Sequence, residues 1–377
     1  MELAFRNARI VTRDEDFIGS ILLRGGKIAA IDRGAGGVGE DLDGDVLMPG
    51  IVDIHTDNLE KHFYPRPNID WDPISAAVVH DGGCLSVGVT TVYDSLSVGS
   101  FNGTAARGHE NLLRLAGGLT TAHAAGMLKA DHRIHWRCET TSDVMGAWLS
   151  DLADHPLATM FSLMDHTPGQ RQYRNLETYL RAWRANGMTE GEVESRLSEC
   201  LDRQNRNTQA NGKLVAEVAK ARGAALISHD DETAAHIDEA ADLGATVAEF
   251  PVTPEAAARA RARGLIIVMG GPNLIRGGSY SGNVPAADLA GMDLLDAFAS
   301  DYVPRSLIEC AFRLASPAFG WPLGRALATV TATAAQAAGL NDRGAVAEGL
   351  RADLLRVRLV DQMPILRGVW TEGRRVA

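Results

Sequence analysis

Short apolar runs that end in polar residues recur eight times between residues 50 and 301. The runs are GIVDIHTD, TTVYDS, RIHWRCE, TMFSLMDH, AALISHDD, TVAEFP, LIIVMGGPN and LLDAFASD. The stretches between them, such as LVAEVAKARG and PEAAARARARG, have a helical pattern and end in glycine, as many helices do. Alternating strands and helices imply parallel strands, and eight such units predict an α/β fold, a (β/α)8 barrel.

A doubly wound open sheet is the alternative arrangement of the same units. It commonly carries a GxGxxG fingerprint with a downstream acidic residue, and we find none in this chain. The barrel is therefore the favoured architecture.

Both ends of the chain have a strand pattern and little helical pattern. SILLRGGKIAAID, near the start, contains two apolar runs around a Gly-Gly pair, and ILRGVWTEGRRV, near the end, has the spacing of a second hairpin. Neither end is long enough to bury much apolar surface alone. We therefore expect them to combine into one small β-sandwich domain, residues 1–50 and 340–377, beside a barrel domain of residues 51–339.

Composition narrows the classes of protein that fit. The chain has 377 residues and a formal net charge of −11, which argues against a nonspecific nucleic-acid binder. Its four cysteines form no CxxC pair, a pattern typical of reduced thiols. The N-terminus has no apolar signal region, and no run is apolar enough to cross a membrane. We expect a cytoplasmic protein that binds neither membrane nor nucleic acid.

Polar residues at the ends of the runs are the main candidates for chemistry, because barrel active sites lie at the C-terminal ends of the strands. Five of the eight runs end in imidazole or carboxylate groups, the ligand types of Zn²⁺, Mn²⁺ and Fe²⁺. The residues at these ends are His55, Asp57, Glu139, Asp165, His166, His229, Asp230, Asp231 and Asp301.

The alternation of side chains along a strand supports His55 and Asp57 as a pair of metal ligands. Side chains two apart on a strand face the same side, so His55 and Asp57 can point at one metal ion. The same alternation makes Cys138, next to Glu139, a packing residue and not a ligand.

Each of these residues also has a structural interpretation. His229 taken alone could be a hydrogen-bonded core histidine. Asp231 and Asp301 could each cap the N-terminus of the following helix. His80, His132 and His135 lie near apolar segments and are left unassigned, with structural roles favoured. The whole set favours a metal site, because so many carboxylates would repel one another without a cation.

Basic and glycine-rich segments follow three of the runs. They are NLEKHFYPRP, TPGQRQY and GGPNLIRGGSYSGN, and all lie at the same end of the predicted barrel as the metal-ligating residues. Glycine lets a backbone approach an anion closely, and arginine can bind phosphate with two hydrogen bonds. Ordinary solvated loops are the alternative. Together the segments predict a small anionic substrate, contacted by Lys61, Arg66, Arg171, Arg276, Ser279 and Asn283.

The motifs LMPGIVDIHTD, SLMDHTPGQRQY, ISHDDET, NLIRGGSYSGN, SDYVP and GAVAEGLRADLLRV together resemble the amidohydrolase superfamily, and more narrowly its branch in phosphonate degradation. The resemblance runs along nearly the whole chain. It implies a (β/α)8 barrel with a small β-sandwich made from both termini. It also implies hydrolysis of a ribose 1-methylphosphonate 5-triphosphate to a 5-phosphate and pyrophosphate.

The resemblance further implies a centre of two divalent ions, with zinc the first choice and manganese or iron the alternatives. Glu139 stands where the superfamily places a bridging ligand, and Asp301 would also accept a proton. The implied ligands are His55, Asp57, Glu139, His166, His229 and Asp301.

Two departures from the superfamily pattern stand out. The usual HxH of the first strand is HxD here. His166 follows the fourth run, whereas the superfamily supplies its two later histidines from strands five and six. Either a strand lies unrecognised between residues 139 and 224, or the ligand scheme differs.

Other functions fit parts of the pattern. A metal centre of this kind could hydrolyse a cyclic amide or an N-acyl compound, and the basic segments favour phosphorus instead. A non-catalytic scaffold with a decayed site is a third hypothesis, opposed by the presence of all six ligand residues. Residues 167–222 are long for one connection and could cover the active site or form a subunit contact. We expect a homo-oligomer, a dimer, with 185–222 as its candidate contact.

Overall fold

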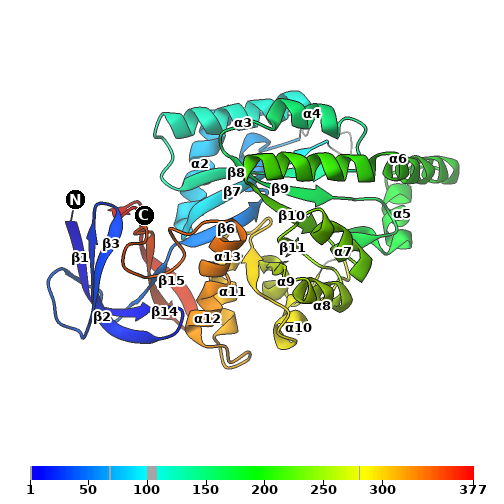
Figure 1. Cartoon of the computed structure of the whole chain (residues 1–377). Helices are drawn as coiled ribbons and strands as arrows, with labels where there is room; N and C mark the ends of the chain where they lie inside the picture. Colours follow the sequence, from blue (N-terminus) through cyan, green and yellow to red (C-terminus); the bar gives the residue numbers. More distant parts are fainter. Residues whose placement is uncertain (1, 68, 100–107, 280) are drawn as a thin grey trace.

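The computed structural model describes residues 2–67, 69–99, 108–279 and 281–377. Its larger part is a barrel of parallel strands surrounded by helices, and its smaller part is a sheet that holds both chain ends (Figure 1). The predicted boundary at residue 50 falls between the last N-terminal strand of the small sheet and the first strand of the barrel.

The barrel contains eight parallel strands in chain order, and each coincides with one of the eight apolar runs. The first and last strands meet through a bridge between Thr56 and Asp301, which closes the barrel. A closed barrel confirms the predicted fold and excludes the open doubly wound sheet. The strands are β6 (Ile51–Thr56), β7 (Val89–Val98), β8 (Asp131–Glu139), β9 (Ala158–Met164), β10 (Ala225–His229), β11 (Val247–Glu249), β12 (Ile266–Gly270) and β13 (Ala297–Ala299).

Helices fill the connections between these strands. The long helix α6 ends at Gly223, whose φ of 61° lies in the left-handed region that glycine adopts without strain. No helix in the described ranges is long and apolar enough to cross a membrane. The helices are α1 (Asn58–Phe63), α2 (Pro73–Ser86), α3 (His109–Ala124), α4 (Met145–Leu152), η2 (Arg171–Tyr173), α5 (Leu176–Ala185), α6 (Glu190–Arg222), α7 (Ala234–Asp242), α8 (Pro254–Ala262), α9 (Gly271–Arg276), α10 (Ala286–Gly291), α11 (Ser306–Leu314), α12 (Leu323–Ala328) and α13 (Ala332–Ala337).

The small sheet is built from both ends of the chain, as predicted. The key pairing joins β5, before the barrel, to β14, after it, in antiparallel register from Leu354 opposite Pro49. The predicted hairpin at Gly25-Gly26 is present, with both glycines at positive φ. The strands are β1 (Glu2–Val11), β2 (Asp16–Arg24), β3 (Lys27–Arg33), β4 (Glu40–Asp41), β5 (Val46–Pro49), β14 (Leu354–Val360), β15 (Met363–Thr371) and β16 (Arg374–Arg375).

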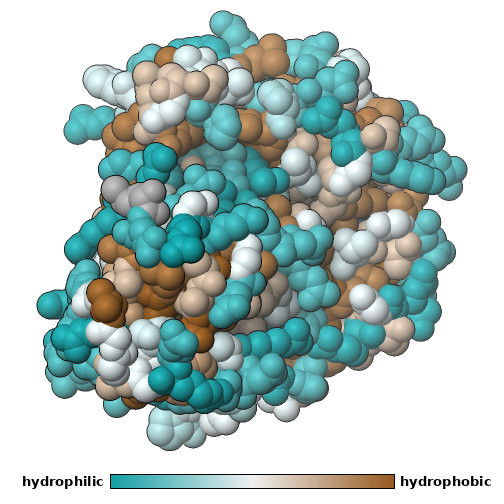
Figure 2. All heavy atoms as spheres, turned by 60° about the vertical axis from the view of Figure 1, so that its left-hand side comes forward, coloured by the Kyte–Doolittle hydropathy of each residue, from teal (hydrophilic) through white to brown (hydrophobic). Residues whose placement is uncertain are grey.

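The small sheet packs directly on the barrel. Leu355 and Val357 of β14 belong to the same buried hydrophobic cluster as Val89 of the barrel. Arg343 adds polar contacts, because its Nη1 donates to Thr91 at 2.8 Å and to Asp131 at 2.6 Å. Figure 2, which turns the small sheet forward, shows hydrophobic side chains scattered among hydrophilic ones on this face.

Residues 167–222 contain no further strand. They form η2, α5 and the 33-residue helix α6, which starts at a capping box of Thr189 and Glu192. The Asn207 side chain donates to the Thr141 carbonyl and the Asn211 side chain to the Thr140 carbonyl, so the middle of α6 holds the loop that follows β8. The N-terminal end of α6, beside α5, extends away from the barrel (Figure 1). His166 therefore follows the fourth barrel strand, and its role as a metal ligand stays a prediction.

Candidate active site

The end of β6 and the segment that follows β13 form the first polar group of the site. The Asp57 N–H donates to the Asp301 carbonyl and the Asp301 N–H donates to the His55 carbonyl, both at 2.9 Å. Asp53 supports this junction from below, because its Oδ1 accepts the backbone N–H of Ser300 at 3.0 Å. Ligand atoms of His55, Asp57 and Asp301 lie within 4.8 Å of one another. Barrel closure thus brings together residues 246 positions apart in the chain.

The ends of β9 and β10 form a second polar group. Ligand atoms of His166, His229 and Asp230 also lie within 4.8 Å of one another, and His229 Nε2 is 3.2 Å from Asp230 Oδ2. Asp230 has a φ of 53°, an unusual conformation for a residue other than glycine. Here the turn directs a carboxylate toward the end of the barrel.

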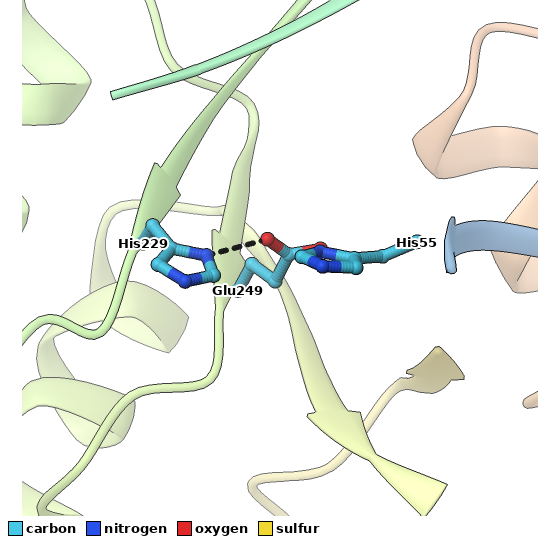
Figure 3. A group of neighbouring side chains, drawn as sticks. All are labelled: His55, His229 and Glu249. Atoms are coloured by element: carbon cyan, nitrogen blue, oxygen red, sulfur yellow. Dashed lines mark hydrogen bonds and ion pairs between the residues drawn. The ribbon is translucent and has the colours of Figure 1, made fainter. Parts of the chain in front are cut away.

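Glu249, at the end of β11, joins the two groups (Figure 3). Its Oε1 lies 2.9 Å from His55 Nδ1 and its Oε2 lies 2.6 Å from His229 Nδ1. The side chain is fully buried. Glu249 thereby fixes both imidazoles with their Nδ1 atoms toward the carboxylate and their Nε2 atoms away from it, as carboxylates commonly do for metal-binding histidines.

The pKa values of Glu249 and His55 are strongly shifted. Burial acts to raise the pKa of Glu249, but the His55 and His229 imidazoles outweigh it and hold that pKa well below its ordinary range. Burial likewise acts to lower the pKa of His55, but Glu249 outweighs it and raises the pKa to about 10. The site therefore attracts positive charge at His55. A metal ion there would displace a proton, so low pH would oppose metal binding.

Arg137 of β8 contacts the first group from inside the barrel. Its Nη1 lies 2.8 Å from Asp57 Oδ1, and its side chain is 10% exposed. Burial acts to lower the pKa of this guanidinium, but the negative charges of Asp57, Glu249 and Asp301 outweigh it and raise the pKa. Arg137 is thus a permanent cation within the centre.

Glu139 and His166 form a pair beside the second group. The carboxylate Oε2 lies 2.6 Å from His166 Nδ1, and Oε1 accepts the Thr141 hydroxyl at 2.8 Å. Both oxygens are therefore engaged, and the carboxylate orients the His166 ring. The predicted bridging role of Glu139 between two metals stays a prediction. Cys138 is buried among apolar residues, as the strand alternation predicted.

Arg171 and Asp231 form a buried pair beneath the second group. The Arg171 Nη1 lies 2.6 Å from Asp231 Oδ1 and also donates to the His229 carbonyl at 3.1 Å. This arrangement holds the end of β10 in place, and the predicted contact of Arg171 with substrate stays a prediction. Asp231 and Asp301 do not cap helices, because α7 is capped by Thr233 and α11 follows Arg305.

A cleft opens beside the two polar groups. Its lining joins Asp230 and Asp301 to Arg276, at the end of α9, and to Ser279 and Asn283 in the loop that follows this helix. These three were predicted as substrate contacts, and the structure brings them next to the predicted metal ligands.

Arg276 and a second cation, Lys61, meet at Tyr302, which also lines this cleft. Arg276 Nη1 donates to its hydroxyl at 3.2 Å, and Lys61 Nζ donates to its carbonyl at 2.9 Å. Arg276 therefore brings positive charge to the same cleft as Asp230 and Asp301, and Lys61 lies beside it at Tyr302. Arg66 is exposed on the loop after α1, and its predicted role stays a prediction.

The three histidines left unassigned from sequence are all buried. His132 and His80 hold Asp94 between them, with nitrogen–oxygen distances of 2.8 Å on each side. Ligand atoms of these three residues also lie within 4.8 Å of one another, but the trio is buried and does not line the cleft. We interpret this second cluster as an ion-pair network between α2 and the barrel. His135 Nδ1 donates to the Ile54 carbonyl at 3.1 Å, beneath His55.

The chemistry of the donors fits divalent metal ions. His55 Nε2 and Asp230 Oδ2 are buried and, among the described residues, have no hydrogen-bond partner. Buried polar atoms without partners are costly, and a coordinated cation removes that cost. Neutral imidazole nitrogens and carboxylate oxygens are ligands of Zn²⁺, Mn²⁺ and Fe²⁺.

Sequence reasoning missed two central residues, Glu249 and Arg137. Glu249 is the last residue of its strand, so the rule that found the other ligands applies to it, but the run TVAEFP was read as ending at proline. Arg137 lies two positions before Glu139 and faces the same side of β8, a parity signal that was available.

Solved structures share this architecture along the whole chain. N-isopropylammelide isopropylaminohydrolase from Burkholderia multivorans has a TM-score of 0.67 at 18% identity, covering 100% of this chain and 98% of that one. N-acetyl-D-glucosamine-6-phosphate deacetylase from Mycobacterium smegmatis has a TM-score of 0.66 at 17% identity, covering 100% of each. No family model matches the sequence. The barrel and the two-ended sheet give this chain the fold of amidohydrolase-superfamily enzymes.

A curated relative narrows this class. The α-D-ribose 1-methylphosphonate 5-triphosphate diphosphatase of Escherichia coli K12 is 38% identical over 378 aligned residues, 99% of this chain and 100% of the relative. The chain belongs to the family of this diphosphatase.

Proposed function

We propose that this protein hydrolyses α-D-ribose 1-methylphosphonate 5-triphosphate to the 5-phosphate and pyrophosphate, with divalent metal ions. The observation that carries the proposal is the cleft itself, whose lining contains Asp230 and Asp301 of the predicted metal centre together with Arg276 at the end of α9. Hydrolysis of a triphosphate needs cations along the phosphate oxygens and groups that position the attacking water. The name of the E. coli relative supports the same substrate.

The metal centre would be held by His55, Asp57 and Asp301 on one side and by His166, His229 and Asp230 on the other. Bound divalent ions would polarise the phosphoryl oxygens and lower the pKa of water. Glu249 would hold the His55 and His229 rings in position.

Asp301 is the proposed general base. It lies on the cleft wall, and burial raises the pKa of its carboxyl above the ordinary value. A raised pKa makes a carboxylate a better proton acceptor. The water oxygen would form a bond to the α-phosphorus as the bond from that phosphorus to the bridging oxygen breaks. Pyrophosphate would leave, and the proton of the water would pass to Asp301.

Lys61 and Arg276 are the proposed contacts for the charged substrate, because both approach the cleft at Tyr302. Ser279 and Asn283, in the loop that follows Arg276, would add neutral hydrogen bonds. The substrate would then lie between the carboxylate groups and this loop.

Phosphorus NMR of the reaction tests the proposal directly. The enzyme, loaded with zinc or manganese, should convert the ribosyl methylphosphonate triphosphate to one equivalent each of 5-phosphate and pyrophosphate. Stepwise release of orthophosphate, or no reaction, would contradict it. Because the structural neighbours include a deacetylase and an aminohydrolase, a panel of N-acyl and cyclic amide compounds is the matched comparison. Faster turnover of that panel would favour carbon–nitrogen hydrolysis.

A further inference from the structure

The predicted metal centre has two halves: the first is His55, Asp57 and Asp301, and the second is His166, His229 and Asp230. The contact between Asp57 and Arg137 makes these two halves unequal. Arg137 Nη1 is 2.8 Å from Asp57 Oδ1, and this oxygen is itself 3.6 Å from His55 Nε2. A metal ion that binds Asp57 Oδ1 at about 2.1 Å would lie within roughly 5 Å of the guanidinium. At that distance two positive charges repel strongly in a buried site.

The negative charge around each half differs as well. In the first group, Asp57 and Asp301 bring two carboxylates, and Arg137 neutralises one of them. In the second, Asp230 is joined by Glu139, which lies 2.6 Å from His166 Nδ1. Glu249 is shared, because one of its oxygens meets each half.

The second half has its own cation nearby, but that cation is already neutralised. Arg171 is paired at 2.6 Å with Asp231, a carboxylate that belongs to neither group. Arg171 is therefore balanced by a carboxylate outside the second group, whereas Arg137 is paired with Asp57, one of the first group's own ligand residues.

We infer that the centre binds its two metal ions with unequal affinity, tightly at His166, His229 and Asp230 and weakly at His55, Asp57 and Asp301, and that Arg137 sets the difference. The inference rests on the metal dependence in the proposed function and not on the identity of the substrate. Arg137 acts here as a positioning and charge-compensating residue for Asp57. It explains why a carboxylate can stand where the superfamily pattern has a histidine: the extra negative charge is balanced within the protein.

Titration of zinc into the metal-free protein, monitored by calorimetry in the absence of substrate, tests the inference. The wild type should bind one equivalent tightly and a second at least about tenfold more weakly. His55→Ala should abolish the weak equivalent, and His166→Ala should abolish or weaken the tight one. Arg137→Gln should tighten the weak equivalent by about tenfold or more, because Asp57 loses its competing partner.

Arg133→Gln is the matched control, because Arg133 lies on the same strand and pairs with Asp131 away from the centre. It should leave both affinities unchanged. Arg137→Lys keeps the charge and should keep the gap between the two equivalents, which preserves the test if the glutamine variant does not fold. Equal affinities in the wild type, or an unchanged second affinity in Arg137→Gln, would overturn the inference. A protein that binds no zinc would instead contradict the metal dependence of the proposed function.

Discussion

Glu249 lies 2.6 Å from His229, oxygen to ring nitrogen, although the two residues stand on neighbouring strands and 20 positions apart. Its other oxygen meets His55, so a single carboxylate sets the ring orientation in both halves of the centre. This arrangement makes Glu249 a sensitive point for metal binding.

Glu249→Gln should therefore weaken metal binding at both positions by about 10- to 100-fold, because an amide cannot accept a hydrogen bond from both Nδ1 atoms. Metal content after dialysis against a graded chelator would measure the loss. Glu255→Gln, on exposed α8, is the control and should retain wild-type metal content. Unchanged affinity in Glu249→Gln would mean that the rings are oriented by other contacts.

Asp301→Asn should retain the fold and lose turnover by several orders of magnitude if Asp301 is the general base. Asparagine tolerates the left-handed φ of 55° at this position, so the backbone should not be the cause of the loss. Asp293→Asn is a matched control with a similar φ of 58° on an exposed turn. Single-turnover kinetics at saturating metal would show whether the chemical step itself is slowed. A rate near that of the wild type would remove Asp301 from the mechanism.

Lys61→Ala and Arg276→Ala should each raise KM for the triphosphate by about tenfold or more, since each removes a charge-assisted contact at the cleft. The effect should shrink as ionic strength rises, because salt screens exposed charges. Arg66→Ala belongs in the same series, as its predicted role is still open. Arg367→Ala, on the exposed surface of the small sheet, should leave KM unchanged. A fall in kcat alone would place Lys61 or Arg276 in the chemical step instead.

The buried network of His80, Asp94 and His132 should contribute stability that depends on pH. Burial acts to lower the pKa of His132, but Asp94 outweighs it and raises the pKa to about 9. This contribution should be complete below about pH 6.5, the pKa of an unfolded histidine, and should disappear as pH rises through about 9. The same contacts lower the pKa of Asp94 to about 2, so the network should also weaken in strong acid.

The test compares thermal unfolding of His132→Gln with that of the wild type between pH 6 and pH 10. The variant should be less stable by about 3 kcal/mol at pH 6, as expected for a broken buried pair, and the gap should narrow toward pH 10. His123→Gln, an exposed change on α3, corrects for general effects of pH. A gap that is constant with pH would show that His132 acts through packing alone.

The sequence alone determined the fold and placed many of the candidate site residues at one end of the barrel. Hydrophobic runs located all eight barrel strands, because a strand buried on both faces must be apolar along most of its length. The polar residue that ends such a run marks the C-terminal face of the barrel. Strand alternation also placed His55 beside Asp57 and turned Cys138 away from the barrel interior, toward apolar residues of the surrounding helices.

Only the tertiary structure decided which polar residues meet. Barrel closure places Asp301 against His55, and neighbouring strands bring Glu249 between His55 and His229. Nothing local in the sequence distinguishes Arg171 from Arg276. In the structure Arg171 is paired with Asp231, whereas Arg276 lines the cleft. The partner of a charged side chain depends on distances across the fold, and those distances arise only when the strands close into a barrel.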